Sequence, residues 1–216
     1  MTSRAPLDVS LFLVIGPGDS RGRAIVDVVL AAVRGGVTAV QLRRKDDAAG
    51  AFVEEARALV EVLRPLGIPL IVNDRVDVAL AADADGVHVG QRDLSVADVR
   101  RIGGDQLLVG LSVTSMDDAR AVPACGVDYA GVGPVFATAS KPDAAAPLGV
   151  DGTRAVCSVL SVPCVAIGGI GIDNIDAVLS TGVSGVAVIS AICAAASPQA
   201  AAVELSERIA RRRVVL

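Results

Sequence analysis

The sequence has no tryptophan and few aromatic residues of any kind, which limits how its core can be built. Aromatics make up 2% of the 216 residues, whereas 52% of the chain is hydrophobic and 22 residues are glycine. The core must therefore consist mainly of Ala, Val, Leu and Ile packed closely around glycine, as in many α/β proteins. A chain this apolar is excluded from the intrinsically disordered class.

Extended basic runs and basic–aromatic stripes are also missing, and the formal net charge is −4. Nucleic-acid-binding surfaces are normally basic, so we expect no nucleic-acid partner. The exception is Arg211-Arg212-Arg213 near the C-terminus. We interpret it as a solvated helix end, where cations are favourably placed against the helix dipole.

No window reaches the run of about 18 apolar residues that spans a membrane. Near the N-terminus, Leu11–Ile15 is too short for a signal segment, and Asp8 interrupts the stretch before it. We therefore expect a cytoplasmic protein without a membrane partner.

Residues that often carry catalysis are scarce. The cysteines at 125, 157, 164 and 193 form no CxxC pair and sit among apolar residues, so buried reduced thiols are expected. No GxSxG nucleophile elbow is present. His88 is the only histidine. Strand parity turns its side chain to the face opposite Val87 and Val89, which would be the inside of a barrel. His88 could be a catalytic group there, but we favour a packed residue that supports a site.

Short apolar runs alternate along the chain with longer amphipathic ones. The predicted strands are Leu11–Ile15, Val37–Arg43, Pro69–Asn73, Gly86–Val89, Leu107–Ser112, Tyr129–Val135, Cys164–Gly168 and Gly185–Ile189. The predicted helices are Arg23–Arg34, Ala51–Arg64, Val76–Ala82, Val96–Ile102, Met116–Val122, Gly152–Val159, Asp173–Leu179 and Gln199–Ile209. Ser95, Ser115 and Asp173 are the expected N-caps.

About eight β-then-α units predict parallel strands joined by helical crossovers. The predicted fold class is α/β, a closed (β/α)8 TIM barrel forming a single domain over residues 1–216, with an open doubly wound sheet as the structural alternative. The stretch Thr138–Gly149 has neither periodicity. We interpret it as either a lid or a locally disordered loop, lying over the C-terminal end of the strands, where such barrels place their sites.

Polar residues end several apolar strands. In the run from Gln41 to Lys45, alternate side chains share a face, so Gln41, Arg43 and Lys45 point one way while Leu42 and Arg44 point the other. An amide and two cations in a row suit anionic oxygens, although a solvated charged loop explains the same residues.

Two carboxylates follow neighbouring strands. Asp74 comes after Asn73 at the end of the third strand, and Asp93 follows the fourth. Neighbouring strands lie about 5 Å apart, so both carboxylates are expected to share one Mg²⁺. Each aspartate could instead cap a helix.

Glycine-bearing segments end the last strands. Ile167 to Gly171 closes the seventh strand and Val188 to Ser190 the eighth, where barrels of this kind commonly bind phosphate through backbone N–H groups. Thr138, Ser140 and Lys141 follow the sixth strand and add hydroxyls and one lysine. Lys141 could instead be an ordinary exposed lysine in a loop.

Together these residues resemble the thiamine-phosphate synthase family from about Leu11 to Ile192. The matching motifs are QLRRK (41–45), VND (72–74), GVHVGQRDL (86–94), GLS (110–112), GPVFATASK (133–141), AIGGI (166–170) and VISAI (188–192). The resemblance implies a transferase that joins a hydroxymethylpyrimidine diphosphate to a thiazole phosphate, plain or carboxylated. The products are thiamine monophosphate and diphosphate, with one Mg²⁺ per site.

The same resemblance assigns residues by position. The pyrimidine diphosphate would be held by Gln41, Leu42, Arg43, Arg44, Lys45, Asn73, Ser112 and Lys141, of which Arg43, Lys45, Ser112 and Lys141 would be catalytic. The thiazole phosphate would be held by Thr138, Ala139, Ser140, Gly169, Ile189 and Ser190. Mg²⁺ would be bound by Asp74 and Asp93.

The departures from the family pattern are small. Arg44 stands where the family often has Glu, and Val113-Thr114 follow Ser112 where Thr-His is usual. Two rival functions remain: a thiazole tautomerase of the same superfamily, and a non-catalytic sensor of a phosphate ligand. An Ala-rich helix surface leaves a homo-oligomer and tight internal packing equally open.

Overall fold

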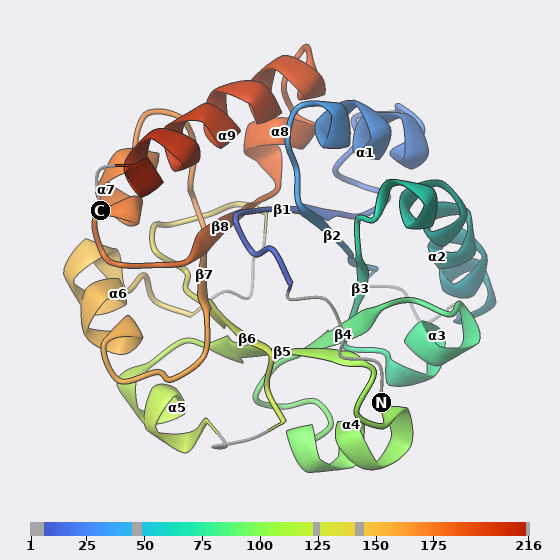
Figure 1. The fold of residues 1–216 in the computed structure, drawn as a ribbon, viewed down its shortest axis with the longest axis horizontal. Helices are drawn as coiled ribbons and strands as arrows, with labels where there is room; N and C mark the ends of the chain where they lie inside the picture. Colours follow the sequence, from blue (N-terminus) through green and yellow to red (C-terminus); the bar gives the residue numbers. More distant parts are fainter. Residues whose placement is uncertain (1–6, 45–48, 123–125, 141–144, 215–216) are drawn as a thin grey trace.

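Eight parallel strands close into a barrel that is surrounded by a ring of helices (Figure 1). The structure is a computed structural model, and it describes residues 7–44, 49–122, 126–140 and 145–214. The strands are β1 (Leu11–Ile15), β2 (Ala39–Leu42), β3 (Leu70–Asn73), β4 (Gly86–Val89), β5 (Leu108–Val113), β6 (Tyr129–Val132), β7 (Cys164–Ile167) and β8 (Gly185–Val188). β8 pairs with β1 in parallel, and this pairing closes the ring.

A helix follows nearly every strand, as the alternating pattern predicts. The helices are α1 (Ile25–Arg34), α2 (Ala49–Leu63), α3 (Val76–Ala81), α4 (Val96–Gly103), α5 (Met116–Ala121), α6 (Gly149–Cys157), α7 (Ile175–Leu179), α8 (Ser190–Cys193) and α9 (Pro198–Val214), with a 3₁₀ turn at Arg64–Leu66. The helical period turns one apolar stripe inward; α2 buries Phe52, Ala56, Leu59 and Leu63 against the strands.

Strand alternation divides the core into two layers. Side chains pointing outward from the barrel, such as Leu11, Val40 and Leu42, pack under the helices. Those pointing inward form a separate cluster that contains Phe12 and Tyr129, whose ring centroids lie 5.1 Å apart. The closed barrel predicted from the sequence is therefore confirmed, and the open-sheet alternative is wrong.

A repeated hydrogen bond ties the strands together at the N-terminal end of the barrel. The backbone N–H groups of Leu11, Leu70 and Val109, at the starts of β1, β3 and β5, donate to side-chain oxygens over 3.1, 2.8 and 2.7 Å. The acceptors are Thr38, Asp85 and Asp128, which directly precede β2, β4 and β6. At each of these places, a side chain satisfies a backbone donor that the strand ladder leaves over.

Two of the three N-caps predicted from the sequence are found in the structure, and the third is not. Ser95 and Ser115 accept hydrogen bonds from the backbone N–H groups of Asp98 and Asp118, so both predicted N-caps are confirmed. The prediction for Asp173 is wrong, because α7 begins at Ile175 with Asn174 in the N-cap position. The Asn174 side chain is used instead to fold the preceding loop, accepting from the Gly171 N–H and donating to the Gly169 carbonyl.

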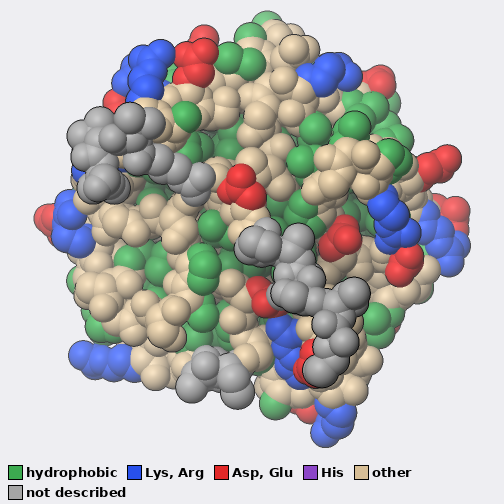
Figure 2. All heavy atoms as spheres, viewed as in Figure 1, with side chains coloured by type: hydrophobic (Ala, Val, Ile, Leu, Met, Phe, Trp, Pro, Cys, Tyr) green, Lys and Arg blue, Asp and Glu red, His purple; other side chains and the backbone are tan. Residues whose placement is uncertain are grey.

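The outer surface mixes charges of both signs. On the face seen in Figure 2, Lys or Arg and Asp or Glu side chains are interspersed around the rim. Several are neighbours along one helix, such as Arg57–Glu54, Arg101–Asp98 and Arg211–Glu207, and each exposed pair stabilises by at most about 1 kcal/mol. Within the described residues, Cys164 and Cys193 are buried and Cys157 is half-buried, all with free thiols. No helix there is long and apolar enough to cross a membrane.

Candidate active site

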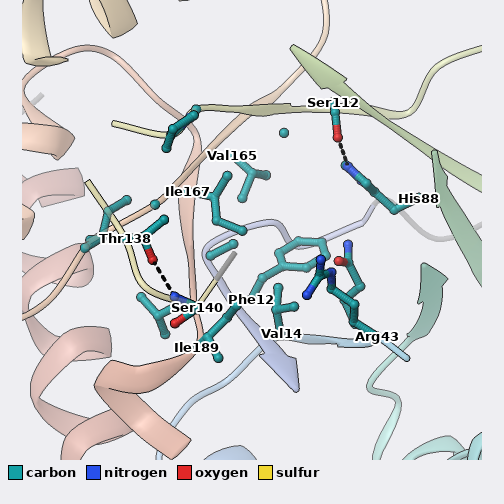
Figure 3. A pocket seen from close by; sticks show the side chains of 18 of the residues that line it. Phe12, Val14, Arg43, His88, Ser112, Thr138, Ser140, Val165, Ile167 and Ile189 are labelled. Atoms are coloured by element: carbon teal, nitrogen blue, oxygen red, sulfur yellow. Dashed lines mark hydrogen bonds between the residues drawn. The ribbon is translucent and has the colours of Figure 1, made fainter. Parts of the chain in front are cut away.

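One cavity opens into the barrel at the C-terminal ends of the strands. Its polar lining residues come mainly from β2 to β5, and its small or apolar ones from β1 and from β6 to β8. In Figure 3, Arg43, His88 and Ser112 stand on one side, and Thr138, Ser140 and Ile189 on the other. Phe12, Val14, Val165 and Ile167 lie between these two groups. The cavity therefore has two polar regions separated by an apolar floor.

The first region follows from strand parity. Gln41 and Arg43 line the cavity, whereas Leu42 is buried under the helices and Arg44 turns outward to Glu55 of α2, at 3.5 Å. The predicted split is confirmed for Gln41 to Arg44, and Lys45 lies outside the described residues. The side chains of Leu42 and Arg44 point away from the cavity, and a role for these two residues in substrate binding stays a prediction. Among the described lining residues, Arg43 is the only charged one.

A buried hydrogen-bond network crosses this region. His88 Nε2 lies 2.9 Å from the Ser112 hydroxyl, and His88 Nδ1 lies 3.0 Å from the Tyr129 hydroxyl, which also hydrogen-bonds the Gln41 side chain. Burial raises the pKa of Tyr129 well above its ordinary value, and the bond with Gln41 offsets part of that rise. Tyr129 therefore stays a protonated phenol, and each member of the network is held by its neighbours.

Glycines make room for this network. A Cβ added at Gly110 would lie 2.3 Å from Tyr129 Cζ and 2.4 Å from His88 Nδ1. One at Gly131 would lie 2.8 Å from His88 Cε1. Real Cβ atoms do not approach other heavy atoms so closely, so the missing side chains on β5 and β6 are what allow His88 and Tyr129 to lie inside the barrel.

The second region is built from backbone. Gly168, Gly169 and Ile170 after β7, and Ile189 and Ser190 after β8, all line the cavity. Within the described part of the chain, the N–H groups of these residues donate to no protein acceptor. Gly168 and Gly169 have φ values of 103° and 64°, and the loop after β6 packs tightly against both. A cluster of unused N–H donors with nearby Thr138 and Ser140 hydroxyls suits a phosphate.

The two predicted metal ligands stand on the rim, outside the cavity lining. The backbone N–H of Asp74 donates to the His88 carbonyl over 2.8 Å, and the Asp93 carboxylate accepts from the Gly90 N–H over 2.7 Å. Both aspartates are thus fastened to the end of β4, and both are exposed. Asp74 also has a φ of 63°, an uncommon conformation for a residue other than glycine.

This donor set fits Mg²⁺. The described residues contain no cluster of three or more His, Cys, Asp or Glu that could enclose a metal by itself. Mg²⁺ does not require one, since it is commonly held by one or two carboxylates together with substrate phosphates and water. Helix capping does not occupy Asp93, because Ser95 caps α4. Asp74 precedes Arg75, which holds the N-cap position of α3.

The other predicted site residues differ in whether they line the cavity. Asn73, Ser112, Thr138, Ser140, Gly169, Ile189 and Ser190 all line the cavity. Ala139 is exposed and lies outside the lining, and its role in holding the thiazole phosphate stays a prediction. Lys45 and Lys141 fall outside the described residues, as does part of the predicted lid. The described end of that lid is fixed, because the N–H groups of Leu148 and Gly149 donate to the carbonyls of Pro134 and Val135.

Sequence reasoning missed several lining residues. Tyr129 is the only tyrosine, and its position in β6 could have placed it inside the barrel with Gly131. Phe12 and Val165 carry no chemical signal and were indistinguishable from ordinary core. The short α8, which begins with Ser190, was also missed, because a helix this short shows no period.

The comparisons with known proteins agree with this geometry. The family model described as thiamine monophosphate synthase matches residues 11–192. A thiamine-phosphate synthase of Chloroflexus aurantiacus is 51% identical over 92% of this chain and 92% of its own length. One of Xanthobacter autotrophicus is 49% identical over 96% and 99%.

Solved structures extend the comparison. The thiamine phosphate pyrophosphorylase from Pyrococcus furiosus superposes with a TM-score of 0.85 at 36% identity, covering 95% of this chain and 98% of that one. A 3-hexulose-6-phosphate synthase, with a TM-score of 0.71 at 19% identity, shares the fold alone. On the sequence matches and the barrel together, this chain belongs to the thiamine monophosphate synthase family.

Proposed function

We propose that this chain makes thiamine monophosphate by joining 4-amino-5-hydroxymethyl-2-methylpyrimidine diphosphate to 4-methyl-5-(2-phosphoethyl)thiazole, plain or carboxylated. Diphosphate is released, and the carboxylated form also loses its carboxylate as CO2. The observation that carries the proposal is the division of one cavity into two anion-binding regions. Arg43 and its neighbours form one, and the unused N–H groups after β7 and β8 form the other. Two phosphorylated substrates that meet over an apolar floor fit this division.

The pyrimidine diphosphate belongs beside β2 to β5. Gln41, Asn73 and Ser112 offer amide and hydroxyl groups to the pyrimidine ring, and the Arg43 guanidinium supplies a fixed fork for the diphosphate. The His88–Tyr129 network holds Ser112 and Gln41 in place beforehand. Lys45 and Lys141 would add positive charge beside the same diphosphate.

Mg²⁺ belongs on Asp74 and Asp93. When bound, it would neutralise charge on the departing diphosphate. Both aspartates are bonded to the end of β4, Asp74 through its backbone and Asp93 through its carboxylate, and β4 lies next to the strand that carries Ser112. The metal would therefore stand at the diphosphate end of the pyrimidine substrate.

The thiazole phosphate belongs at the other side of the cavity. Its phosphate would accept from the N–H groups of Gly169 and Ser190 and from the hydroxyls of Thr138 and Ser140. Its ring would lie over Val165 and Ile167, with the ring nitrogen facing the pyrimidine methylene.

The chemistry then needs little proton transfer. The bond from the pyrimidine methylene to the diphosphate oxygen breaks with both electrons going to diphosphate, and the electron-rich ring stabilises the resulting carbocation. The thiazole nitrogen attacks through its lone pair and has no proton to lose. The protein therefore contributes positioning, charge stabilisation and an apolar floor that keeps water from the cation.

The test is diphosphate release by purified protein given both substrates, with and without Mg²⁺. We expect release only when both substrates and Mg²⁺ are present, with thiamine monophosphate formed in equal amount. Isomerisation of a thiazole phosphate without diphosphate release would identify a tautomerase. Mg²⁺-independent binding of the thiazole phosphate with no turnover at all would identify a sensor.

A further inference from the structure

Arg23, in the loop between β1 and α1, joins two segments that lie far apart in the sequence. Its guanidinium donates to the Ser20 carbonyl over 3.1 Å, to the Ala195 carbonyl over 3.1 Å, and to the Cys193 carbonyl. Ser20 belongs to the same loop, whereas Cys193 ends α8 and Ala195 follows it. The side chain is partly buried and lies outside the lining of the cavity.

The N-terminal end of α8 carries part of the second polar region, where we place the thiazole phosphate. Ile189 and Ser190 precede and begin this helix, and both line the cavity. The helix has 4 residues. At 1.5 Å per residue it is about 6 Å long, so a shift of its C-terminal carbonyls moves the Ile189–Ser190 turn by a similar amount. The Cys193 thiol reinforces the attachment, since it lies 3.9 Å from the Val14 carbonyl of β1.

The loop that holds Arg23 is itself fixed to the first polar region. Gly16 directly follows β1, and its N–H donates to the Asp19 carboxylate over 2.8 Å. A Cβ on Gly16 would lie 2.1 Å from the Arg43 carbonyl, so this loop packs directly on the backbone of the diphosphate-binding strand. Arg23 therefore connects α8 to a loop that packs on the residue following β2.

We propose that Arg23 is a positioning residue for the thiazole phosphate, acting through α8. Arg23 touches neither substrate. It holds the Ile189–Ser190 turn in the position from which the N–H groups of that turn can donate to the phosphate. The inference rests on the proposed function, because it takes the thiazole phosphate to occupy that turn.

An arginine is required by the geometry. Three carbonyls in different directions accept from one planar guanidinium, and a lysine ammonium on its flexible stem cannot reach all of them in the same arrangement. Arg23→Lys keeps the charge and removes most of the fixed contacts, so it tests positioning separately from electrostatics.

Arg100 offers a matched control at the other end of the barrel. It donates to the carbonyls of Gly126, Gly104 and Leu107, and it pairs with Asp128 at 2.8 Å. Like Arg23, it is a partly buried arginine that holds backbone carbonyls of separate segments, but these segments lie far from the cavity. Arg100→Lys should lower stability without changing how either substrate binds.

The experiment measures thiazole phosphate binding by calorimetry in the wild type and in the Arg23→Lys, Arg23→Ala and Arg100→Lys variants. Initial rates give the KM of each substrate, and thermal unfolding reports folding. Arg23→Lys should raise both the Kd and the KM for the thiazole phosphate about tenfold, which corresponds to about 1.4 kcal/mol, and Arg23→Ala should raise them further. The KM for the pyrimidine diphosphate should stay within about twofold, and Arg100→Lys should bind as the wild type does.

Three outcomes would overturn the inference. Wild-type Kd values in Arg23→Lys and Arg23→Ala would show that α8 needs no such support. Equal losses for both substrates, or the same loss in Arg100→Lys, would show that the effect is general destabilisation. Wild-type protein that does not bind the thiazole phosphate would overturn the proposed function itself, and the inference with it.

Discussion

The starts of the strands and the loops that follow β7 and β8 treat their backbone donors in opposite ways. At the N-terminal end, N–H groups at the starts of β1, β3 and β5 donate to Thr38, Asp85 and Asp128. At the C-terminal end, the N–H groups of Gly168–Ile170 and Ile189–Ser190 have no acceptor within the described residues. Gly169 and Ser190 are exposed at the cavity, so a ligand that supplies acceptors can reach their N–H groups.

Aspartates mark the same contrast on a single strand. Asp85 directly precedes β4 and Asp93 follows it, and each carboxylate accepts one backbone N–H, over 2.8 and 2.7 Å. The local bonding is alike, but only Asp93 has Asp74 as a neighbour at the end of the strand. Position along the barrel axis therefore separates a structural aspartate from a candidate metal ligand.

Asp93→Asn and Asp74→Asn should produce the largest effect. Each should lower kcat/KM by about a hundredfold and raise the Mg²⁺ concentration for half-maximal rate, because a carboxylate ligand of the metal becomes a neutral amide. Diphosphate release measured across a Mg²⁺ titration checks this. The control is Asp85→Asn, which should lose stability and keep the wild-type Mg²⁺ response. An unchanged Mg²⁺ response in both Asp74→Asn and Asp93→Asn would remove the metal site from the proposal.

Gly110→Ala should come next, acting on the His88–Tyr129 hydrogen-bond network. Its Cβ would displace Tyr129 and His88, so we expect a loss of about 1–3 kcal/mol in unfolding free energy and weaker pyrimidine diphosphate binding. Urea unfolding and calorimetry measure the two effects. Gly50→Ala on α2 has open space around the new methyl group and should be neutral or slightly stabilising. Wild-type substrate binding in Gly110→Ala would mean that the network does not shape the site.

His88→Ala should have a smaller effect on turnover than on stability. The substitution leaves the Tyr129 and Ser112 hydroxyls without their partner, which should cost about 1–3 kcal/mol of unfolding free energy. The KM for the pyrimidine diphosphate should rise, while kcat falls by less than about tenfold, because the proposed reaction needs no general base. Complete loss of turnover in a folded variant that still binds both substrates would instead make His88 catalytic.

Asp118→Asn should have the smallest effect and a distinct pH dependence. Burial pushes the pKa of Asp118 upward, but hydrogen bonds from Thr114 and Ser115 outweigh it and leave the pKa below its ordinary value of 3.8. A depressed carboxyl pKa stabilises the fold above that value, and the contribution is lost as the pH falls through the folded pKa.

The difference in unfolding free energy between wild type and Asp118→Asn should therefore be constant near neutral pH and shrink below about pH 4. Urea unfolding at pH 7 and pH 3 measures it. Asp118 accepts hydrogen bonds from Thr114, which lines the cavity. Activity should nevertheless change little, because the Asp118 carboxylate itself does not line the cavity. A difference that does not change with pH would contradict the assignment.

The sequence was most informative where one physical rule decides the outcome. Apolar runs set the strands, and the period of two put Gln41 and Arg43 on one face, which lines the cavity, and Arg44 on the other. β6 ends earlier than predicted, at Val132, because Pro134 has no N–H with which to continue the ladder. Local sequence therefore predicted the strands and the faces of their side chains, but strand ends less well.

Features that depend on distant contacts could not be predicted. That Gly110 makes space for His88 and Tyr129 depends on the register between β4, β5 and β6. The three acceptors of Arg23 lie on Ser20, Cys193 and Ala195, and no periodicity links the latter two to residue 23. Such contacts exist only after the barrel has closed.

The inner wall of the barrel also limits how the protein can change through evolution. Gly110, Gly131 and Gly133 each face an atom that a single added carbon would strike, so the shape of the reaction chamber is set by side chains that are missing. Any mutation at these positions enlarges a residue, whereas the exposed surfaces of the helices can accept new side chains at little cost. Selection for a different substrate would therefore meet the strictest barrier at the smallest residues.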